Sequence, residues 1–99
     1  MNAHILVVDD HVEMADNISS VLQLAQYRVT TATSGKEGVK QATRLHPDLI
    51  LCDIMMPDLD GFGVYHIVRS DPETADIPFV FLSAKSTLQD VREGMNLGA

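Results

Sequence analysis

Short apolar or β-branched runs alternate with longer amphipathic segments along this chain. The runs lie at residues 5–8, 29–32, 49–52 and 77–82, and each is short enough for one buried strand. In the segments that follow them, apolar residues recur every three or four positions, which is the spacing of a helix with one buried face. Four alternations of strand and helix predict an α/β fold, with a parallel sheet, helices on both faces and right-handed crossovers.

Cap and turn residues predict where the helices begin. Ser34 followed by Glu37 predicts a capping box, Asp60 is a predicted N-cap, and Ser86 with Gln89 predicts another box. The expected apolar faces, in chain order, are Met14, Ile18, Val21, Leu22 and Ala25; Val39, Ala42 and Leu45; Val64, Ile67 and Val68; and Leu88, Val91 and Met95. Tyr27-Arg28, His46-Pro47, Pro72 and Gly98 are expected to close the four helices.

Three aspartates follow two of the predicted strands. Asp9 and Asp10 come directly after the first run, and Asp53 comes directly after the third. If these strands lie side by side and parallel, the three carboxylates meet at the sheet edge where α/β proteins bind ligands. Like charges this close either raise each other's pKa or bind a hard cation, and Mg²⁺ is the usual cation of an all-oxygen site. The cluster therefore indicates a functional site.

Composition limits the classes of function. The 99 residues are 45% hydrophobic, which fits one globular domain over residues 1–99. A net charge of -7 argues against direct binding to nucleic acid or to an anionic membrane surface. Cys52 is the single cysteine, so no internal disulfide can form, and its apolar run favours a buried small hydrophobe. With no basic stretch at the start and no apolar run of bilayer length, we expect a cytoplasmic protein.

Histidines and glycines add little chemistry. The four histidines share no metal-ligand spacing, and only His11 is close enough in sequence to the aspartates to affect them. The glycines do not form a phosphate-binding loop of the Walker or dinucleotide type, so nucleotide binding is not expected.

Five sequence blocks, taken in order, resemble one known family. They are Val7-Val8-Asp9-Asp10, residues 48–53 (DLILCD), residues 56–61 (MPDLDG), Phe81-Leu82-Ser83-Ala84, and Leu97-Gly98-Ala99. Together they make the whole chain similar to the receiver domains of bacterial two-component response regulators. The resemblance implies a flavodoxin-like, doubly wound parallel sheet with strand order 2-1-3-4. It also implies a phosphorylated signalling domain that sits beside an effector domain in a longer parent chain.

The resemblance assigns roles to individual residues. Asp53 is implied to be the phosphoacceptor, which attacks a phosphohistidine on a partner histidine kinase. Asp10 and Asp53 are implied to bind Mg²⁺ directly, Asp9 through a water, and Met55 through its backbone carbonyl. Ser83 is implied to be the hydroxyl switch that bonds the phosphoryl group. Such a domain is not an enzyme for other substrates, because it promotes only its own phosphorylation and dephosphorylation.

The sequence departs from the family pattern near residue 99. The family continues into a fifth strand with a lysine and an aromatic switch residue, and then a fifth helix; none of these lies within residues 1–99, so no catalytic lysine is assigned. Lys85 stands two residues beyond Ser83, where the family varies, and is interpreted as a solvated charge at the pocket rim. We therefore expect slow or absent phosphorylation in this form. Without the fifth strand, residues 79–82 would form an exposed apolar edge, so we also expect a homodimer, through this edge or by exchange of elements.

Simpler interpretations stand beside these. Asp9 and Asp10 also suit a turn and a helix cap, and Ser83 also suits the end of a strand. A second hypothesis is a dimeric interaction fragment that keeps the receiver fold without phosphoryl transfer. A third is a phosphohydrolase of the haloacid-dehalogenase type, but such enzymes need an acid two residues after the nucleophile, where this chain has Met55.

Overall fold

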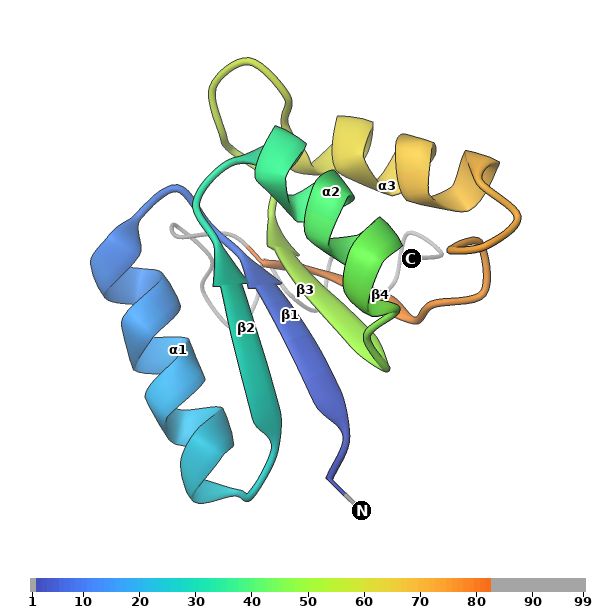
Figure 1. The fold of residues 1–99 in the computed structure, drawn as a ribbon. Helices are drawn as coiled ribbons and strands as arrows, with labels where there is room; N and C mark the ends of the chain where they lie inside the picture. The colour runs from blue at the N-terminus through green and yellow to red at the C-terminus, as the bar shows by residue number, and fades with distance from the viewer. Residues whose placement is uncertain (1, 83–99) are drawn as a thin grey trace, which may run out of the picture.

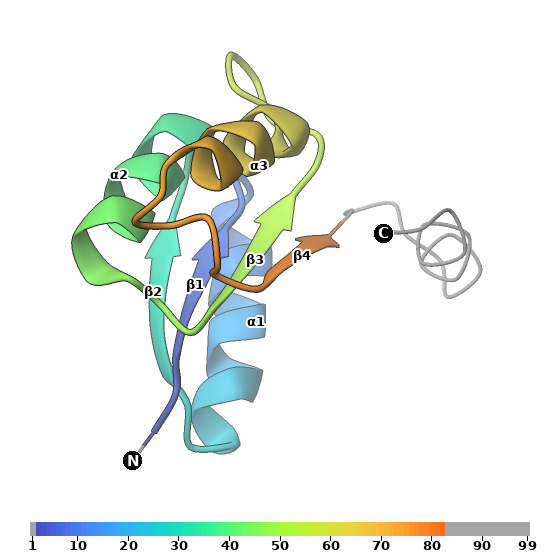
Figure 2. The same ribbon diagram turned by 90° about the vertical axis from the view of Figure 1, so that its right-hand side faces the viewer.

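A four-stranded parallel sheet forms the centre of the molecule. The computed structural model of the chain describes residues 2–82. The strands are β1 (His4–Val8), β2 (Arg28–Ala32), β3 (Leu49–Asp53) and β4 (Phe79–Leu82). They lie in the order β2-β1-β3-β4 and every neighbouring pair is parallel, as Figures 1 and 2 show. The predicted α/β class and strand order are therefore confirmed for the described strands.

Helices cover both faces of this sheet. One face carries α1 (Val12–Leu24), and the other carries α2 (Gly35–Leu45) and α3 (Gly61–Ser70), as Figure 1 shows. Successive side chains of a strand point to opposite faces, so β1 contributes side chains to a hydrophobic core on each face of the sheet. Ile5 and Val7 pack with Ala15 under α1, whereas Leu6 and Val8 pack on the side of α2 and α3.

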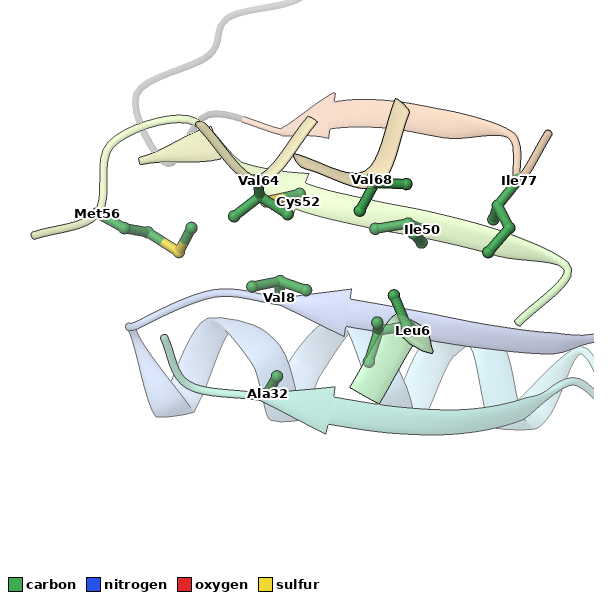
Figure 3. Packing of buried hydrophobic residues seen from close by; sticks show 10 residues of the cluster. Leu6, Val8, Ala32, Ile50, Cys52, Met56, Val64, Val68 and Ile77 are labelled. Atoms are coloured by element: carbon green, nitrogen blue, oxygen red, sulfur yellow. The ribbon is translucent and has the colours of Figure 1, made fainter. Parts of the chain in front are cut away.

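The larger core fixes α2 and α3 against the sheet. Figure 3 shows Val64 and Val68 of α3 over the β3 residues Ile50 and Cys52. Gly38 of α2 lies so close to β1 that a Cβ there would clash with the side chain of Val8. This close packing holds the ends of β1 and β3 beside each other.

The helix caps follow the sequence in part. Asp60 caps α3 as predicted, because its Oδ1 accepts a hydrogen bond of 2.8 Å from the backbone amide of Gly63. Ser34 caps α2 by accepting a 3.1 Å bond from the amide of Glu37. The predicted reciprocal bond is absent, because the Glu37 carboxylate contacts the amide and hydroxyl of Thr33 instead. The capping box at Ser34 is therefore only half formed.

Some predicted boundaries and faces were wrong. The fourth strand begins at Phe79 rather than at Ile77, because the Ile77 amide bonds the Thr74 carbonyl in a turn and Pro78 has no amide hydrogen. The first helix ends at Leu24, before the predicted Tyr27-Arg28 stop. Residues with a helical apolar spacing are also not all buried, since Val21 and Ile67 are exposed. The fourth predicted helix, with Ser86, Gln89 and Gly98, lies outside the described residues.

Candidate functional site

The carboxyl ends of β1 and β3 bring the three predicted aspartates together. Val8 pairs with Cys52 in the parallel register, so the next residues, Asp9 and Asp53, leave neighbouring strands side by side. The Asp9 amide also donates a 3.0 Å bond to the Ala32 carbonyl at the end of β2, which holds this turn to the sheet. The convergence expected from the sequence is therefore confirmed.

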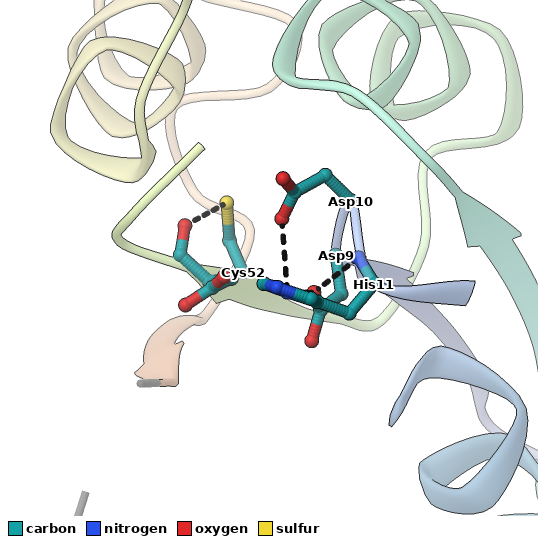
Figure 4. A network of polar contacts seen from close by, with 5 residues as sticks. Asp9, Asp10, His11 and Cys52 are labelled. Carbon is teal, nitrogen blue, oxygen red and sulfur yellow. Dashed lines mark hydrogen bonds and ion pairs between the residues drawn. The ribbon is translucent and has the colours of Figure 1, made fainter. Parts of the chain in front are cut away.

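Two of these carboxylates are buried. Asp53 is 0% exposed and Asp9 is 1% exposed, whereas a quarter of the Asp10 side chain meets solvent. One ligand atom each from Asp9, Asp10, His11 and Asp53 lies within 4.8 Å of the others. Figure 4 shows most of this cluster at the sheet edge. Within the described residues, neither carboxylate oxygen of Asp53 accepts a hydrogen bond.

The charge of Asp53 is costly in this setting. Burial raises the pKa of its carboxyl above the ordinary value of 3.8, and the negative charges of Asp9 and, less strongly, Asp10 raise it further. The backbone amides of Met55 and Ile54 oppose the rise in pKa, although neither forms a hydrogen bond to the carboxylate. Buried carboxylates without partners need a proton or a cation. The donor set, all oxygen apart from His11, fits a hard divalent cation.

His11 belongs to this cluster, although the sequence indicated only that it was near enough to the aspartates to affect them. Its Nδ1 lies 3.2 Å from an oxygen of Asp9 and 3.2 Å from an oxygen of Asp10. Its backbone amide also donates a 2.9 Å bond to Asp9. The only sequence signal for this placement was that His11 directly follows the aspartate pair, because the direction of a side chain at a helix start is not encoded in spacing.

The loop after Asp53 is held close to the sheet edge. The Gly61 amide donates a 2.9 Å bond to the Ile54 carbonyl, and a Cβ at Gly61 would clash with the backbone oxygen of Asp53. Asp58 has a positive φ of 66°, which a non-glycine residue adopts at some cost. The Met55 side chain is exposed, and Ser83 and Lys85 lie outside the described residues.

Cys52 behaves as the buried hydrophobe that the sequence predicted. Its side chain is fully buried, and its thiol lies 3.3 Å from the Asp53 carbonyl, to which it donates. Burial, together with the charge of Asp53, raises the pKa of Cys52 to about 12. The thiol is therefore uncharged at neutral pH and poorly nucleophilic.

Comparisons with known proteins decide the family. A family model described as "Response regulator receiver domain" matches residues 5–99. The chain belongs to the response regulator receiver domains. Among curated proteins, it is 42% identical over 95 residues to the DNA-binding dual master transcriptional regulator RpaA of Synechocystis, covering 96% of this chain and 39% of that protein. It is 39% identical over 99 residues to the response regulator PleD of Caulobacter vibrioides, covering 100% of this chain and 22% of that protein.

Solved structures agree with this receiver assignment. The N-terminal domain of a response regulator receiver protein from Methanoculleus marisnigri has a TM-score of 0.81 and 39% identity, covering 92% of this chain and 75% of that one. The chemotaxis protein CheY4 of Vibrio cholerae has a TM-score of 0.83 and 31% identity, and the match covers 100% of this chain and 82% of that one. The flavodoxin-like receiver fold with the order 2-1-3-4 is thus confirmed, and the phosphohydrolase hypothesis is wrong. The receiver domain spans about two fifths or less of the lengths of these two curated relatives.

Among residues 2–82, no helix is both long enough and apolar enough to cross a bilayer.

Proposed function

We propose that this receiver domain accepts a phosphoryl group on Asp53 from a histidine kinase, with Mg²⁺ bound beside it. One observation carries the proposal: Asp53 is a fully buried carboxylate without a hydrogen-bond partner, beside Asp9 and Asp10 at the sheet edge. Such a group is costly to keep and is suited to bonding with a cation and an electrophile. The family assignment supports phosphoryl transfer as the reaction class.

The transfer exchanges one bond to phosphorus for another. An oxygen of Asp53 attacks the phosphorus, the P–N bond to the kinase histidine breaks, and the leaving imidazole takes up a proton. Asp10 and Asp53 are proposed to hold Mg²⁺ directly, Asp9 through a water and Met55 through its carbonyl. When bound, Mg²⁺ offsets the negative charge that builds up on the phosphoryl oxygens. A carboxylate is a weak nucleophile. The fixed position of Asp53, as the last residue of β3 and against the backbone at Gly61, must therefore supply much of the catalysis.

Ser83 and an effector domain are proposed to carry the signal onward. Ser83 directly follows β4, whose last residue Leu82 pairs with Asp53, so its hydroxyl is a suitable hydrogen-bond donor to a phosphoryl oxygen. The curated relatives are longer than this chain, which supports an effector domain elsewhere in the parent protein. With a net charge of -7, the receiver domain is proposed to act on that effector in the cytoplasm, without binding nucleic acid or membrane. It is proposed to catalyse only its own phosphorylation and dephosphorylation.

Self-association through β4 is a further part of the proposal. Within the described sheet β4 is an edge strand, and Val80 on it is 47% exposed. Apolar edges pair with other chains, so the 99-residue chain is proposed to form a homodimer there. Light scattering at high micromolar concentration should give a dimer mass for the wild type and a monomer for Val80→Lys. A wild-type monomer at that concentration would contradict the pairing.

Acetyl phosphate tests the central step without the cognate kinase. The chain is incubated with acetyl phosphate and Mg²⁺, and tandem mass spectrometry locates any phosphoryl group. Because no catalytic lysine is assigned within residues 1–99, the proposal expects slow modification at Asp53, loss of modification in Asp53→Asn, and strong loss in Asp10→Asn. Asp16→Asn is the matched control, because it removes an exposed aspartate of α1. An unmodified wild type with an intact fold would favour the interaction-fragment hypothesis instead.

A further inference from the structure

We propose that His11 is an additional metal ligand, through Nδ1, and that it shifts the selectivity of the aspartate site from Mg²⁺ toward first-row transition ions such as Mn²⁺. The inference rests on the proposed function, in which the three aspartates bind a divalent cation. It goes further because it adds a nitrogen donor to the oxygen site and names the ions that this donor favours.

The distances around His11 suit ligands of one ion. Nδ1 is 3.2 Å from a carboxylate oxygen of Asp9 and 3.2 Å from one of Asp10. Two adjacent ligands of an octahedral ion, each about 2.1 Å from the metal, are about 3.0 Å apart. Nδ1 and the Asp10 oxygen therefore already stand near the spacing of two direct ligands of one ion. The Asp9 oxygen, which is proposed to act through a water, lies beside them, and a ligand atom of Asp53 completes a group within 4.8 Å.

A second observation shows that the cluster needs a ligand. Both oxygens of Asp53 are buried and lack a hydrogen-bond partner within the described residues. Buried polar atoms in folded proteins are nearly always paired. A cation among these four residues supplies the missing partner.

The imidazole of His11 is not engaged in capping the helix that it precedes. His11 is the N-cap residue of α1, where a side chain usually accepts a bond from the first turn, yet no such bond forms. Instead the ring lies against the two carboxylates, as Figure 4 shows. The ring is 60% exposed, so it can adjust by the few tenths of an ångström that coordination requires.

Ligand chemistry then sets the selectivity. Mg²⁺ prefers oxygen ligands and retains several waters, so an imidazole adds little to its binding. Imidazole suits transition ions, and affinity for a mixed nitrogen and oxygen site generally rises from Mn²⁺ along the first row. A site of three carboxylates and one imidazole is thus expected to favour Mn²⁺ over Mg²⁺ more than an all-oxygen site does.

Metal binding by variants tests this without phosphorylation. Mn²⁺ affinity of the 99-residue chain is measured by electron paramagnetic resonance, and Mg²⁺ affinity by competition against Mn²⁺. Pulsed measurements on the bound Mn²⁺ then report a nitrogen nucleus in its coordination sphere. The variants are His11→Ala, Asp10→Asn and, as matched control, His66→Ala, which removes an exposed histidine of α3.

A His11 that binds the metal and a His11 that only lies beside the carboxylates predict different results. Loss of a ligand should weaken Mn²⁺ binding about tenfold or more, change Mg²⁺ binding by less than about threefold and abolish the nitrogen signal, while His66→Ala leaves all three unchanged. Equal changes for both ions, or a nitrogen signal that persists in His11→Ala, would overturn the inference. The proposed function survives that result if Asp10→Asn still removes metal binding. A wild type that binds neither ion would overturn both.

Discussion

Replacing Asp53 by asparagine should stabilise the metal-free receiver domain at neutral pH. The substitution keeps the size of the side chain and removes a negative charge that is fully buried and has no hydrogen-bond partner among the described residues. Ligand atoms of Asp9 and Asp53 are at most 4.8 Å apart. At that separation and an effective dielectric constant of about 20, two unit charges repel by about 3.5 kcal/mol. A buried amide without partners costs about 1–2 kcal/mol, so a net gain of about 2 kcal/mol is expected.

The gain should depend on pH in a defined direction. The folded state raises the pKa of Asp53, so the folded chain binds this proton more tightly than the unfolded chain. The cost of the charged carboxylate therefore grows as pH rises above its ordinary value of 3.8, and it is complete above the raised folded pKa. Below pH 3.8 the carboxyl is protonated in both states, and the advantage of Asp53→Asn should disappear.

Urea unfolding of both proteins in EDTA, between pH 3.5 and 8, measures this gain. Saturating Mg²⁺ should then stabilise the wild type far more than Asp53→Asn, because the cation offsets the same repulsion. Asp16→Asn, on the exposed surface of α1, should change stability by less than about 0.5 kcal/mol at any pH. An Asp53→Asn variant that is no more stable than wild type at pH 7.5, or equally stabilised at pH 3.5, would refute the reasoning.

Three further substitutions test the surroundings of the site. Gly61→Ala should push the backbone of Asp53 aside, lowering both stability and acetyl phosphate labelling, and unchanged labelling would count against the close approach. Arg69→Met removes two 2.7 Å hydrogen bonds from the guanidinium to the backbone carbonyls of residues 75 and 77. Urea unfolding should therefore show a loss of about 2–4 kcal/mol in the free energy of unfolding, and a loss below about 0.5 kcal/mol would contradict a stabilising role for these bonds. Asp58→Gly removes the cost of a positive φ, so the free energy of unfolding should increase by about 1 kcal/mol and the thermal midpoint should rise. A lower midpoint would argue against backbone strain at this position.

Much of the fold follows from the alternation of apolar runs and helical spacing. Parallel strands with crossover helices allow few arrangements, and the order β2-β1-β3-β4, which only the resemblance to receiver domains implied, is confirmed. The meeting of Asp9, Asp10 and Asp53 followed from the same topology, because the carboxyl ends of β1 and β3 are neighbours. The aspartates at the strand ends, together with the strand order implied by the resemblance, were therefore enough to locate the site.

Details that depend on side-chain packing were not accessible from the sequence. Helical spacing made Val21 and Ile67 candidates for burial, but only packing decides which edge of an apolar stripe meets the sheet, and both are exposed. Glu37 has the right spacing for a capping box, yet Thr33 competes for its carboxylate. The rotation of His11 toward the aspartates likewise depends on the local backbone at the start of α1.

Fluorine NMR of a beryllofluoride complex tests the central claim most directly, because beryllofluoride imitates a phosphoryl group on a carboxylate. With Mg²⁺ present, the wild-type domain should show signals from protein-bound fluoride, and these should vanish when Mg²⁺ is withdrawn or when Asp53 is replaced by asparagine. Bound-fluoride signals that persist in Asp53→Asn, or their absence from a folded wild type with Mg²⁺, would contradict the claim that Asp53 is the phosphoacceptor.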